Sequence, residues 1–300
     1  MQRISFYDQI RKNKRNSILL VFPIAIMVVV LLFIIGYILA PGLLVFIVMF
    51  GITWMTMQAI ISYKYGDRAV LSVMKAKPAD PVKHIYLINT VEGLSLAAGI
   101  PVPKVYVIES DEINAFAVGR DPQHASIGVT TGALENLNRV ELEGVVGHEI
   151  SHIRNYDIRF MTMIAVFVGF AAILSYLLLR GFLFAGSSRQ RGDRGGGMAA
   201  LLVLIGLILA VIAPIATRLV QAMISRRREY LADASSVELT RYPEGLASAL
   251  EKIKNKNAGK MEVSEAISHL FFTDPKRSPL DDLFATHPPI TERIKILRQM

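Results

Sequence analysis

Residues 148–152 of this 300-residue chain read His148-Glu149-Ile150-Ser151-His152. On an α-helix of 3.6 residues per turn, positions four apart share a face, so both imidazoles can bind one metal ion. Glu149 then lies about 100° round the helix, where it reaches a metal-bound water molecule rather than the metal. Metal-assisted hydrolysis requires this arrangement. Such a motif arises by chance in about 1% of chains of this composition, so its context has to support it.

The flanking sequence predicts a helix through the motif. Asn138 is followed three positions later by Glu141, which matches a capping box, and apolar residues then recur at roughly helical spacing. Gly144 and Gly147 each weaken a helix by about 1 kcal/mol relative to alanine. Small residues also permit close packing behind the metal, so the helix prediction stands.

A catalytic zinc ion usually has three protein ligands, and the third is expected downstream. The segment Arg226–Asp233 holds Glu229 and Asp233 four residues apart, on one face of a predicted helix. We expect Glu229 to be the third ligand, and Asp233 to accept a hydrogen bond from a ligating histidine and so fix its tautomer. A solvated helix face of arginine and glutamate is the alternative reading of this segment.

Four segments occur in this order along the chain: Asn114-Ala115-Phe116, His148–His152, Ser225–Asp233 and Thr286-His287-Pro288. Together they resemble the HtpX-type membrane zinc metalloproteases, relatives of the type-I CAAX prenyl proteases, over nearly the whole chain. The resemblance implies one bound Zn²⁺ ion and a substrate cleft lined by Asn114, Ala115 and Phe116. It also implies that His287 and Arg293 lie near the oxyanion formed during peptide hydrolysis. The sequence by itself leaves His287 as a turn residue before two prolines.

Composition independently places the chain among integral membrane proteins. It is 52% hydrophobic with a mean hydropathy of +0.41, and the apolar residues are concentrated in long runs. Four segments are long enough to span the bilayer, at about 18–40, 42–62, 160–179 and 198–217. The first could be a secretory signal, but its length favours an uncleaved anchor. The last two could form a partly re-entrant pair, because four arginines lie between them.

Lysine and arginine residues flank these segments mainly on one side, which we expect to be cytoplasmic. The expected fold is an α-rich integral membrane protein with four transmembrane helices and a cytoplasmic α+β protease domain of the zincin type with a small β-sheet. The expected units are residues 1–62 with the first hairpin, 63–159 with the metal-binding motif, 160–217 with the second hairpin, and 218–300 with the third ligand. The segment between the two hairpins should hold a linker over Lys64–Asp80, a helix over Pro81–Ala98, and strands over Lys104–Ile108, Ala115–Val118 and Ser126–Thr130.

The strand that begins at Asn114 is expected to bind substrate, because an exposed edge strand near the zinc can pair with an extended peptide. A plain hairpin with Phe116 in the core is the alternative. For catalysis, the zinc would lower the pKa of a bound water molecule, and Glu149 would accept its proton and pass it to the leaving amine.

Three functions are compatible with these observations. The first is a zinc endopeptidase of the cytoplasmic (inner) membrane that, by resemblance, cleaves misfolded or damaged membrane proteins or unfolded polypeptides. The second is a prenyl-protein endopeptidase, and the third is a membrane scaffold that retains the motif without turnover. The net charge of +8 is explained by flanks that face anionic lipid, and no nucleic-acid-binding motif occurs. Absence of cysteine excludes disulfides and thiolate ligands.

Overall fold

A computed structural model describes residues 29, 33, 37, 41–159, 161–163, 165–166, 226–257, 261, 265–268, 270–273 and 288–300. Three of the four predicted membrane segments, near 18–40, 160–179 and 198–217, therefore lie entirely or almost entirely outside the described residues. The second predicted segment is fully covered.

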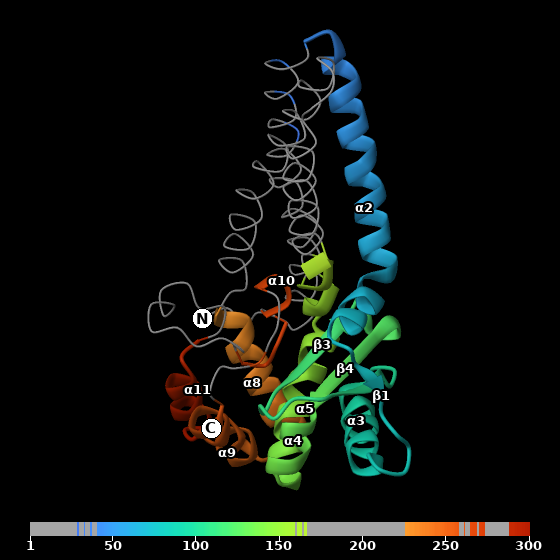
Figure 1. Cartoon of the computed structure of the whole chain (residues 1–300). Helices are drawn as coiled ribbons and strands as arrows, with labels where there is room; N and C mark the ends of the chain where they lie inside the picture. The colour runs from blue at the N-terminus through green and yellow to red at the C-terminus, as the bar shows by residue number, and fades with distance from the viewer. Residues whose placement is uncertain are drawn as a thin grey trace, which may run out of the picture.

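That segment forms the upper part of helix α2, Leu44–Val73, which follows a short 3₁₀ turn at Pro41–Leu43. Among the described residues, α2 is the one helix long and apolar enough to cross a membrane. Only 12% of its most apolar 18-residue window is buried, at a mean hydropathy of 2.1. Apolar side chains that no protein covers need another apolar environment, which a bilayer supplies. Figure 1 shows α2 rising away from the sheet and the other helices.

The helix also continues eleven residues beyond the predicted end of the span, so the predicted linker is wrong for its first ten residues, Lys64–Val73. Val70, Leu71 and Met74 are buried in one hydrophobic cluster with Phe116 and Val118. This tertiary packing keeps a locally polar sequence helical. The apolar helix is thus joined to the sheet without a break.

The sheet has four strands in the order β1-β2-β4-β3. Strands β2 and β4 run parallel, whereas β1 is antiparallel to β2, and β3 is antiparallel to β4. Their bounds are Lys77–Pro78, Lys104–Ile108, Ala115–Gly119 and Ala125–Thr130. The three predicted strands are confirmed to within one residue, and β1 was not predicted. Strand β3 lies at one edge of the sheet.

Helix α3 covers Ile85–Ala98 and starts four residues later than predicted. Residues 81–84 form a turn instead, in which Asp80 accepts hydrogen bonds from the backbone N–H groups of Val82 and Lys83. The end of the helix is as predicted: Gly99 has φ +68°, a left-handed conformation that glycine adopts without strain.

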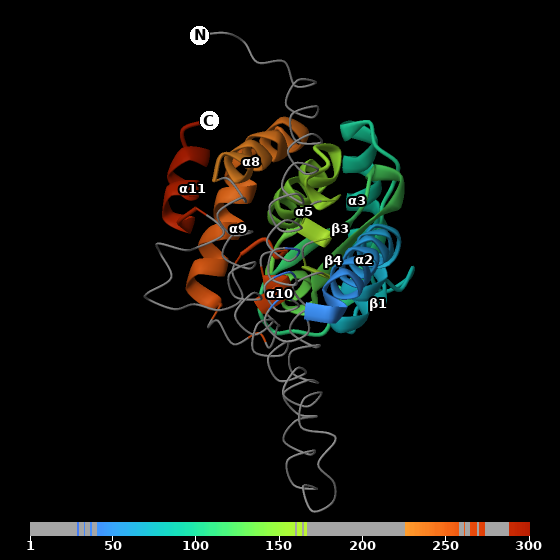
Figure 2. The ribbon, with the colours of Figure 1, turned by 90° about the horizontal axis from the view of Figure 1, so that it is seen from above.

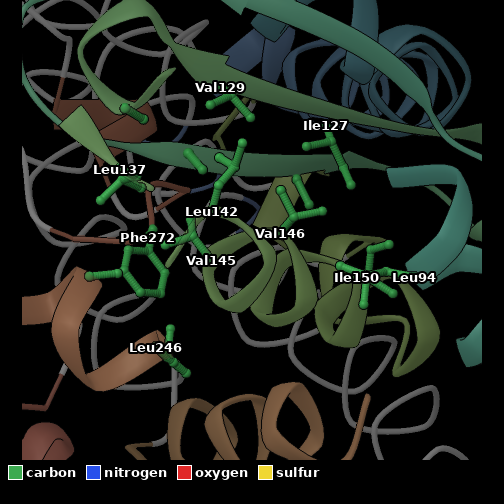
Figure 3. Close-up of a cluster of buried hydrophobic side chains, with 14 of the residues drawn as sticks. Leu94, Ile127, Val129, Leu137, Leu142, Val145, Val146, Ile150, Leu246 and Phe272 are labelled. Carbon is green, nitrogen blue, oxygen red and sulfur yellow. The ribbon is translucent and has the colours of Figure 1, made fainter. Parts of the chain in front are cut away.

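The central helix is α5, Arg139–Arg154, which carries the metal-binding motif. The other described helices are α4 (Thr131–Asn136), α8 (Arg226–Thr240), α9 (Pro243–Lys256), α10 (Glu265–Ser268) and α11 (Ile290–Leu297). Figures 1 and 2 show α5 between the sheet and the group α8, α9 and α11. Side chains of α5 such as Val146 and Ile150 pack with Ile127 and Val129 of β4, and Leu246 of α9 joins the same core (Figure 3).

Glycines let α8 and α9 approach α5 closely. A Cβ atom on Gly144 would lie 2.8 Å from the backbone nitrogen of Leu246, and one on Gly147 would lie 2.8 Å from Oγ of Ser236. Ser236 uses the space to donate a hydrogen bond to the carbonyl oxygen of Gly144, at 2.7 Å. The glycines that weaken the helix prediction are therefore required by packing, Gly144 against α9 and Gly147 against α8.

The predicted capping box at the start of α5 is confirmed. Asn138 accepts from the N–H of Glu141, and Glu141 accepts from the N–H of Asn138. The buried Glu141 carboxylate also accepts from Ser248 at 2.9 Å and Lys252 at 2.7 Å, both on α9. Burial alone would raise the pKa of Glu141, but these donors hold it below its ordinary value of 4.5. One carboxylate thus both caps α5 and fastens it to α9.

We expect Glu141→Gln to destabilise the protein by about 1–3 kcal/mol, because it removes charge-assisted hydrogen bonds inside the fold. Thermal unfolding in detergent measures this change. A carboxylate whose pKa is lowered on folding adds stability above its unfolded-state pKa and loses it as the pH falls through the folded value. The difference in unfolding free energy between wild type and the Glu141→Gln variant should therefore shrink as the pH falls below 4.5. Glu251→Gln removes the same charge from an exposed pair with Arg298 and should change stability little; equal effects of the two variants would contradict this role of Glu141.

Candidate metal centre

Three predicted ligands converge between α5 and α8. The Nε2 atoms of His148 and His152 are 3.1 Å apart. One carboxylate oxygen of Glu229 lies 3.7 Å from Nε2 of His148, and the other lies 3.5 Å from Nε2 of His152. All three side chains are buried. The structure therefore brings together the two histidines of the motif and a carboxylate from a segment far along the chain.

These residues fit a divalent metal ion such as zinc. Two imidazole nitrogens and one carboxylate oxygen are a common donor set of catalytic zinc sites. Metal–ligand bonds of about 2.0–2.1 Å in a tetrahedron place the ligand atoms about 3.3 Å apart. The two imidazole nitrogens are 3.1 Å apart, and the Glu229 oxygen nearest each of them lies at 3.7 and 3.5 Å, so all three residues are close to the separation that a shared ion requires.

A buried carboxylate fixes the orientation of the first histidine. Nδ1 of His148 lies 2.9 Å from Oδ1 of Asp233, which stands one turn after Glu229 on α8. Arg293 of α11 holds Asp233 in turn through two hydrogen bonds, of 2.9 and 2.7 Å, to its two carboxylate oxygens. The rings of Phe272 and His148 pack edge to face, and the guanidinium carbon of Arg293 lies 4.7 Å from the centre of the Phe272 ring. With Nδ1 held by Asp233, the imidazole presents Nε2 to the metal.

Asp157 plays the same part for the second histidine, and the sequence analysis missed it. Nδ1 of His152 lies 3.2 Å from Oδ2 of Asp157, whose other oxygen lies 3.4 Å from Arg228 of α8. The chain reaches this position because Tyr156 adopts a left-handed conformation, φ +61°, just after α5 ends. The signal in the sequence is a carboxylate five residues after the second histidine, which helical spacing alone does not place beside it.

The two histidines differ in their affinity for protons. Burial lowers the pKa of His148 to about 4. Burial would also lower the pKa of His152, but its hydrogen bond with Asp157 and the charges of Glu229 and Glu149 raise it to about 9. In the metal-free chain His148 thus favours its neutral form and His152 its protonated form. A metal ion that binds here displaces the proton of His152, since metal ligands must be deprotonated.

Glu149 lies in this buried environment too, with an exposed fraction of 2%. Burial raises its pKa to about 8, and the negative charge of Glu229 also raises it, whereas His152 and Arg293 lower it. A carboxyl group with a pKa near neutrality can both accept and release a proton. Its place beside the ligands is consistent with a general base.

The predicted substrate strand is not an open edge. Asn114, Ala115 and Phe116 are buried, and the carbonyl oxygen of Ala115 accepts a hydrogen bond from the N–H of Phe272 at 2.8 Å. Phe116 pairs with Phe271 in an isolated bridge, and the Asn114 side chain bonds the carbonyl oxygen of Thr273. The chain's own residues 270–273 thus cover this part of β3, and Phe116 lies in the core. Whether these three residues contact substrate stays a prediction.

Of the two residues expected near the oxyanion, the structure describes Arg293 only. His287 lies outside the described residues. Arg293 is fully buried and lies on the Nδ1 side of His148, where it contacts Asp233 and the carbonyl oxygen of Phe272. The metal-facing atom of His148 is Nε2, and the expected place of Arg293 near the oxyanion stays a prediction. The structure gives Arg293 the position of a support for Asp233.

Comparison with known proteins decides the family. The family model described as Peptidase family M48 matches residues 81–300. The chain belongs to peptidase family M48. Three relatives, each named Protease HtpX homolog, cover its full length or nearly so. They come from Caldanaerobacter subterraneus subsp. tengcongensis (42% identical, 100% of this chain and 99% of the relative), Dictyoglomus thermophilum (41%, 100% and 96%) and Streptococcus thermophilus (40%, 98% and 99%).

A solved structure with a similar fold is the crystal structure of S. mikatae Ste24p. It has a TM-score of 0.51 at 19% identity, over 95% of this chain and 65% of that chain. The likeness concerns the fold. Membership of peptidase family M48 makes this chain a metalloendopeptidase, and His148, His152 and Glu229 form its candidate metal site. The predicted family and enzyme class are thereby confirmed.

We expect Asp157→Asn to weaken zinc binding by about 10- to 100-fold, because the amide no longer holds His152 as a carboxylate does. Competition with a chelator of known affinity measures the change. Asp111→Asn removes an exposed carboxylate and should leave zinc affinity unchanged. Wild-type affinity in the Asp157 variant would show that this carboxylate does not orient the ligand.

We also expect Arg293→Lys to weaken zinc binding together with peptide cleavage, because lysine cannot replace a two-point contact with Asp233. The same competition assay and a cleavage assay at saturating zinc separate two roles. If Arg293 supports Asp233, the Arg293→Lys variant binds zinc more weakly. If zinc affinity is unchanged and only kcat falls, Arg293 acts on the reacting peptide, as the family resemblance implies.

Proposed function

We propose that this chain is a zinc-dependent endopeptidase of the cytoplasmic membrane that hydrolyses misfolded or damaged membrane proteins at the cytoplasmic face. The observation that carries the zinc assignment is the convergence of three buried ligand residues, His148, His152 and Glu229, whose ligand atoms lie within 4.8 Å of one another. The relatives named Protease HtpX homolog support the proteolytic activity.

Zinc held by His148, His152 and Glu229 would polarise the peptide carbonyl and acidify a water molecule. Glu149 accepts the proton of the attacking water on its carboxylate and delivers it to the leaving amine. Burial raises the pKa of Glu149, which makes its carboxylate a stronger base and favours acceptance of the proton. Asp233 and Asp157 keep the imidazoles in place during turnover, so the ligands do not have to reorganise.

The membrane assignment rests on α2 and on the composition of the chain. Lys64 is the first charged residue after the apolar run, and the helix then packs directly into the core beside β3. This connection keeps the protease domain at the membrane surface. Placement on the cytoplasmic side follows from the lysine and arginine residues that flank the predicted spans.

For substrate binding, we retain the proposal that an extended peptide lies along β3 near Asn114, Ala115 and Phe116. The N–H of Phe272 now bonds the carbonyl oxygen of Ala115, so a peptide that pairs there has to displace residues 270–273 from the strand. Pairing through the backbone selects extended chains rather than one sequence. Unfolded segments of membrane proteins meet that requirement.

We expect Glu149→Gln to reduce cleavage of unfolded casein by at least about 100-fold while zinc stays bound, because the variant loses the base but no ligand. The assay uses the full chain in detergent, with zinc content measured in the same samples. Glu143→Gln is a matched control on the same helix, outside the metal site, and should cut like wild type.

Equal cleavage by wild type and the Glu149 variant would point to a contaminating protease. No cleavage by any zinc-loaded variant, including wild type, would favour a membrane scaffold or an enzyme of narrow substrate range over the proposed function.

A further inference from the structure

A cluster of cations and tyrosines lies where α2 leaves its apolar stretch. The guanidinium carbons of Arg120 and Arg159 each lie 5.7 Å from the centre of the Tyr63 ring. Arg159 also lies 5.3 Å from the Tyr156 ring, and its Nε donates a 2.7 Å hydrogen bond to the carbonyl oxygen of Arg120. We name Tyr63, Arg120, Tyr156 and Arg159 the arginine–tyrosine cluster.

The cluster is built by α2, the end of β3 and the segment that follows α5, and the packing of these three segments fixes its position. A Cβ atom on Gly66 of α2 would lie 3.0 Å from the Thr162 side chain, so the two segments touch. Thr162 also accepts a hydrogen bond from the N–H of Gly119, the last residue of β3. Arg120 follows Gly119 directly, and Arg159 precedes Thr162 by three residues. The two guanidinium groups are therefore held on Tyr63 by the fold rather than placed there by flexible tails.

The charges in and around the cluster are mainly positive. Lys64 and Arg68 of α2 lie 5.4 and 5.7 Å from the ring of Tyr65. Within the described part of the chain, Asp121 is the one carboxylate at ion-pair distance from the two cluster arginines, 3.5 Å from Arg120. Asp67 is the other acid on this stretch of α2. This end of α2 and the cluster together carry four cations and two carboxylates, and Tyr63 and Tyr65 are 40% and 43% exposed.

The cluster also lies at the depth of lipid headgroups if α2 spans the membrane. From Leu44 to Ser62 the helix rises about 28 Å at 1.5 Å per residue, close to the thickness of the hydrocarbon layer. Tyr63 and Lys64 come next, at the interface, where tyrosine and lysine are enriched in membrane proteins. Figure 1 shows α2 continuing from this level into the domain.

We propose that the arginine–tyrosine cluster binds the phosphate headgroup of an anionic phospholipid and seats the protease domain on the membrane. Guanidinium groups bind phosphate oxygens in a planar, two-point geometry, and two of them lie on one exposed ring. Basic side chains at an anionic surface each add about 1 kcal/mol to binding. This inference rests on the membrane-spanning role of α2 in the proposed function, but not on catalysis.

The test is native mass spectrometry of the full chain in detergent with equal amounts of phosphatidylglycerol and phosphatidylcholine that have the same acyl chains. Wild type should retain more phosphatidylglycerol. Arg120→Gln/Arg159→Gln should lower this preference, by about fivefold for each arginine removed. Arg120→Lys/Arg159→Lys keeps the charges and should retain most of it. Lys83→Gln/Lys104→Gln removes two exposed charges elsewhere on the domain and should behave like wild type.

The proposal is overturned if wild type shows no preference, if the double glutamine variant keeps it, or if the Lys83/Lys104 control loses it equally. Thermal unfolding of each variant identifies loss of preference caused by misfolding. If the double glutamine variant misfolds, the lipid preference of the double lysine variant decides the proposal. Cleavage of casein in detergent is measured alongside. We expect the glutamine variant to cut like wild type, so a failure of lipid selectivity and a failure of the proteolytic function remain distinguishable.

Discussion

Two buried carboxylate–imidazole hydrogen bonds set the geometry on which the metal centre depends. Asp233 holds Nδ1 of His148 at 2.9 Å, and Asp157 holds Nδ1 of His152 at 3.2 Å. Both rings consequently turn Nε2 toward Glu229. Buried charges are stable only when paired, and here each carboxylate has an arginine on its other side. Burial would raise the pKa of Asp233, but Arg293 and His148 lower it to about 2, so it stays ionised and accepts the histidine N–H.

The rest of the fold brings these partners together. His148 and His152 lie on α5, whereas Glu229 and Asp233 lie on α8, so the site exists only while the two helices are packed closely. Gly147 allows that approach, Gly144 allows α9 to lie close to α5, and Glu141 fastens the start of α5 to α9. On the other face of α5, the apolar side chains pack on the sheet, and α2 joins that sheet to the predicted membrane span. The metal centre and the membrane are therefore connected through packed secondary structure.

Local rules predicted much of this from sequence. The spacing of His148 and His152, the capping box at Asn138 and the alternating apolar strands depend on residues close together in the chain. Glu229 and Asp233 could be named because their four-residue spacing repeats that logic on a second helix. These predictions concern which residues share a face, and periodicity decides that.

The misses depend on an irregular turn or on contacts between distant segments. Asp157 reaches His152 only through the left-handed turn at Tyr156, and α2 stays helical past Lys64 because its lower end is buried in the domain core. The edge of β3 is covered by residues 270–273, which no local pattern indicates. Arg293 comes from α11 and bonds Asp233 on α8, a contact that the sequence does not indicate. Apart from the turn at Tyr156, tertiary packing overrode local preference.

X-ray absorption at the zinc edge of the purified full chain tests the central claim most directly. The chain has six histidines and no cysteine, so thiolate sulfur cannot contribute to the spectrum. The account predicts one zinc per chain with two imidazole ligands at about 2.0–2.1 Å, a carboxylate oxygen, and one imidazole fewer in His152→Ala. A zinc ion with three or more imidazoles, or a spectrum unchanged in His152→Ala, would contradict it.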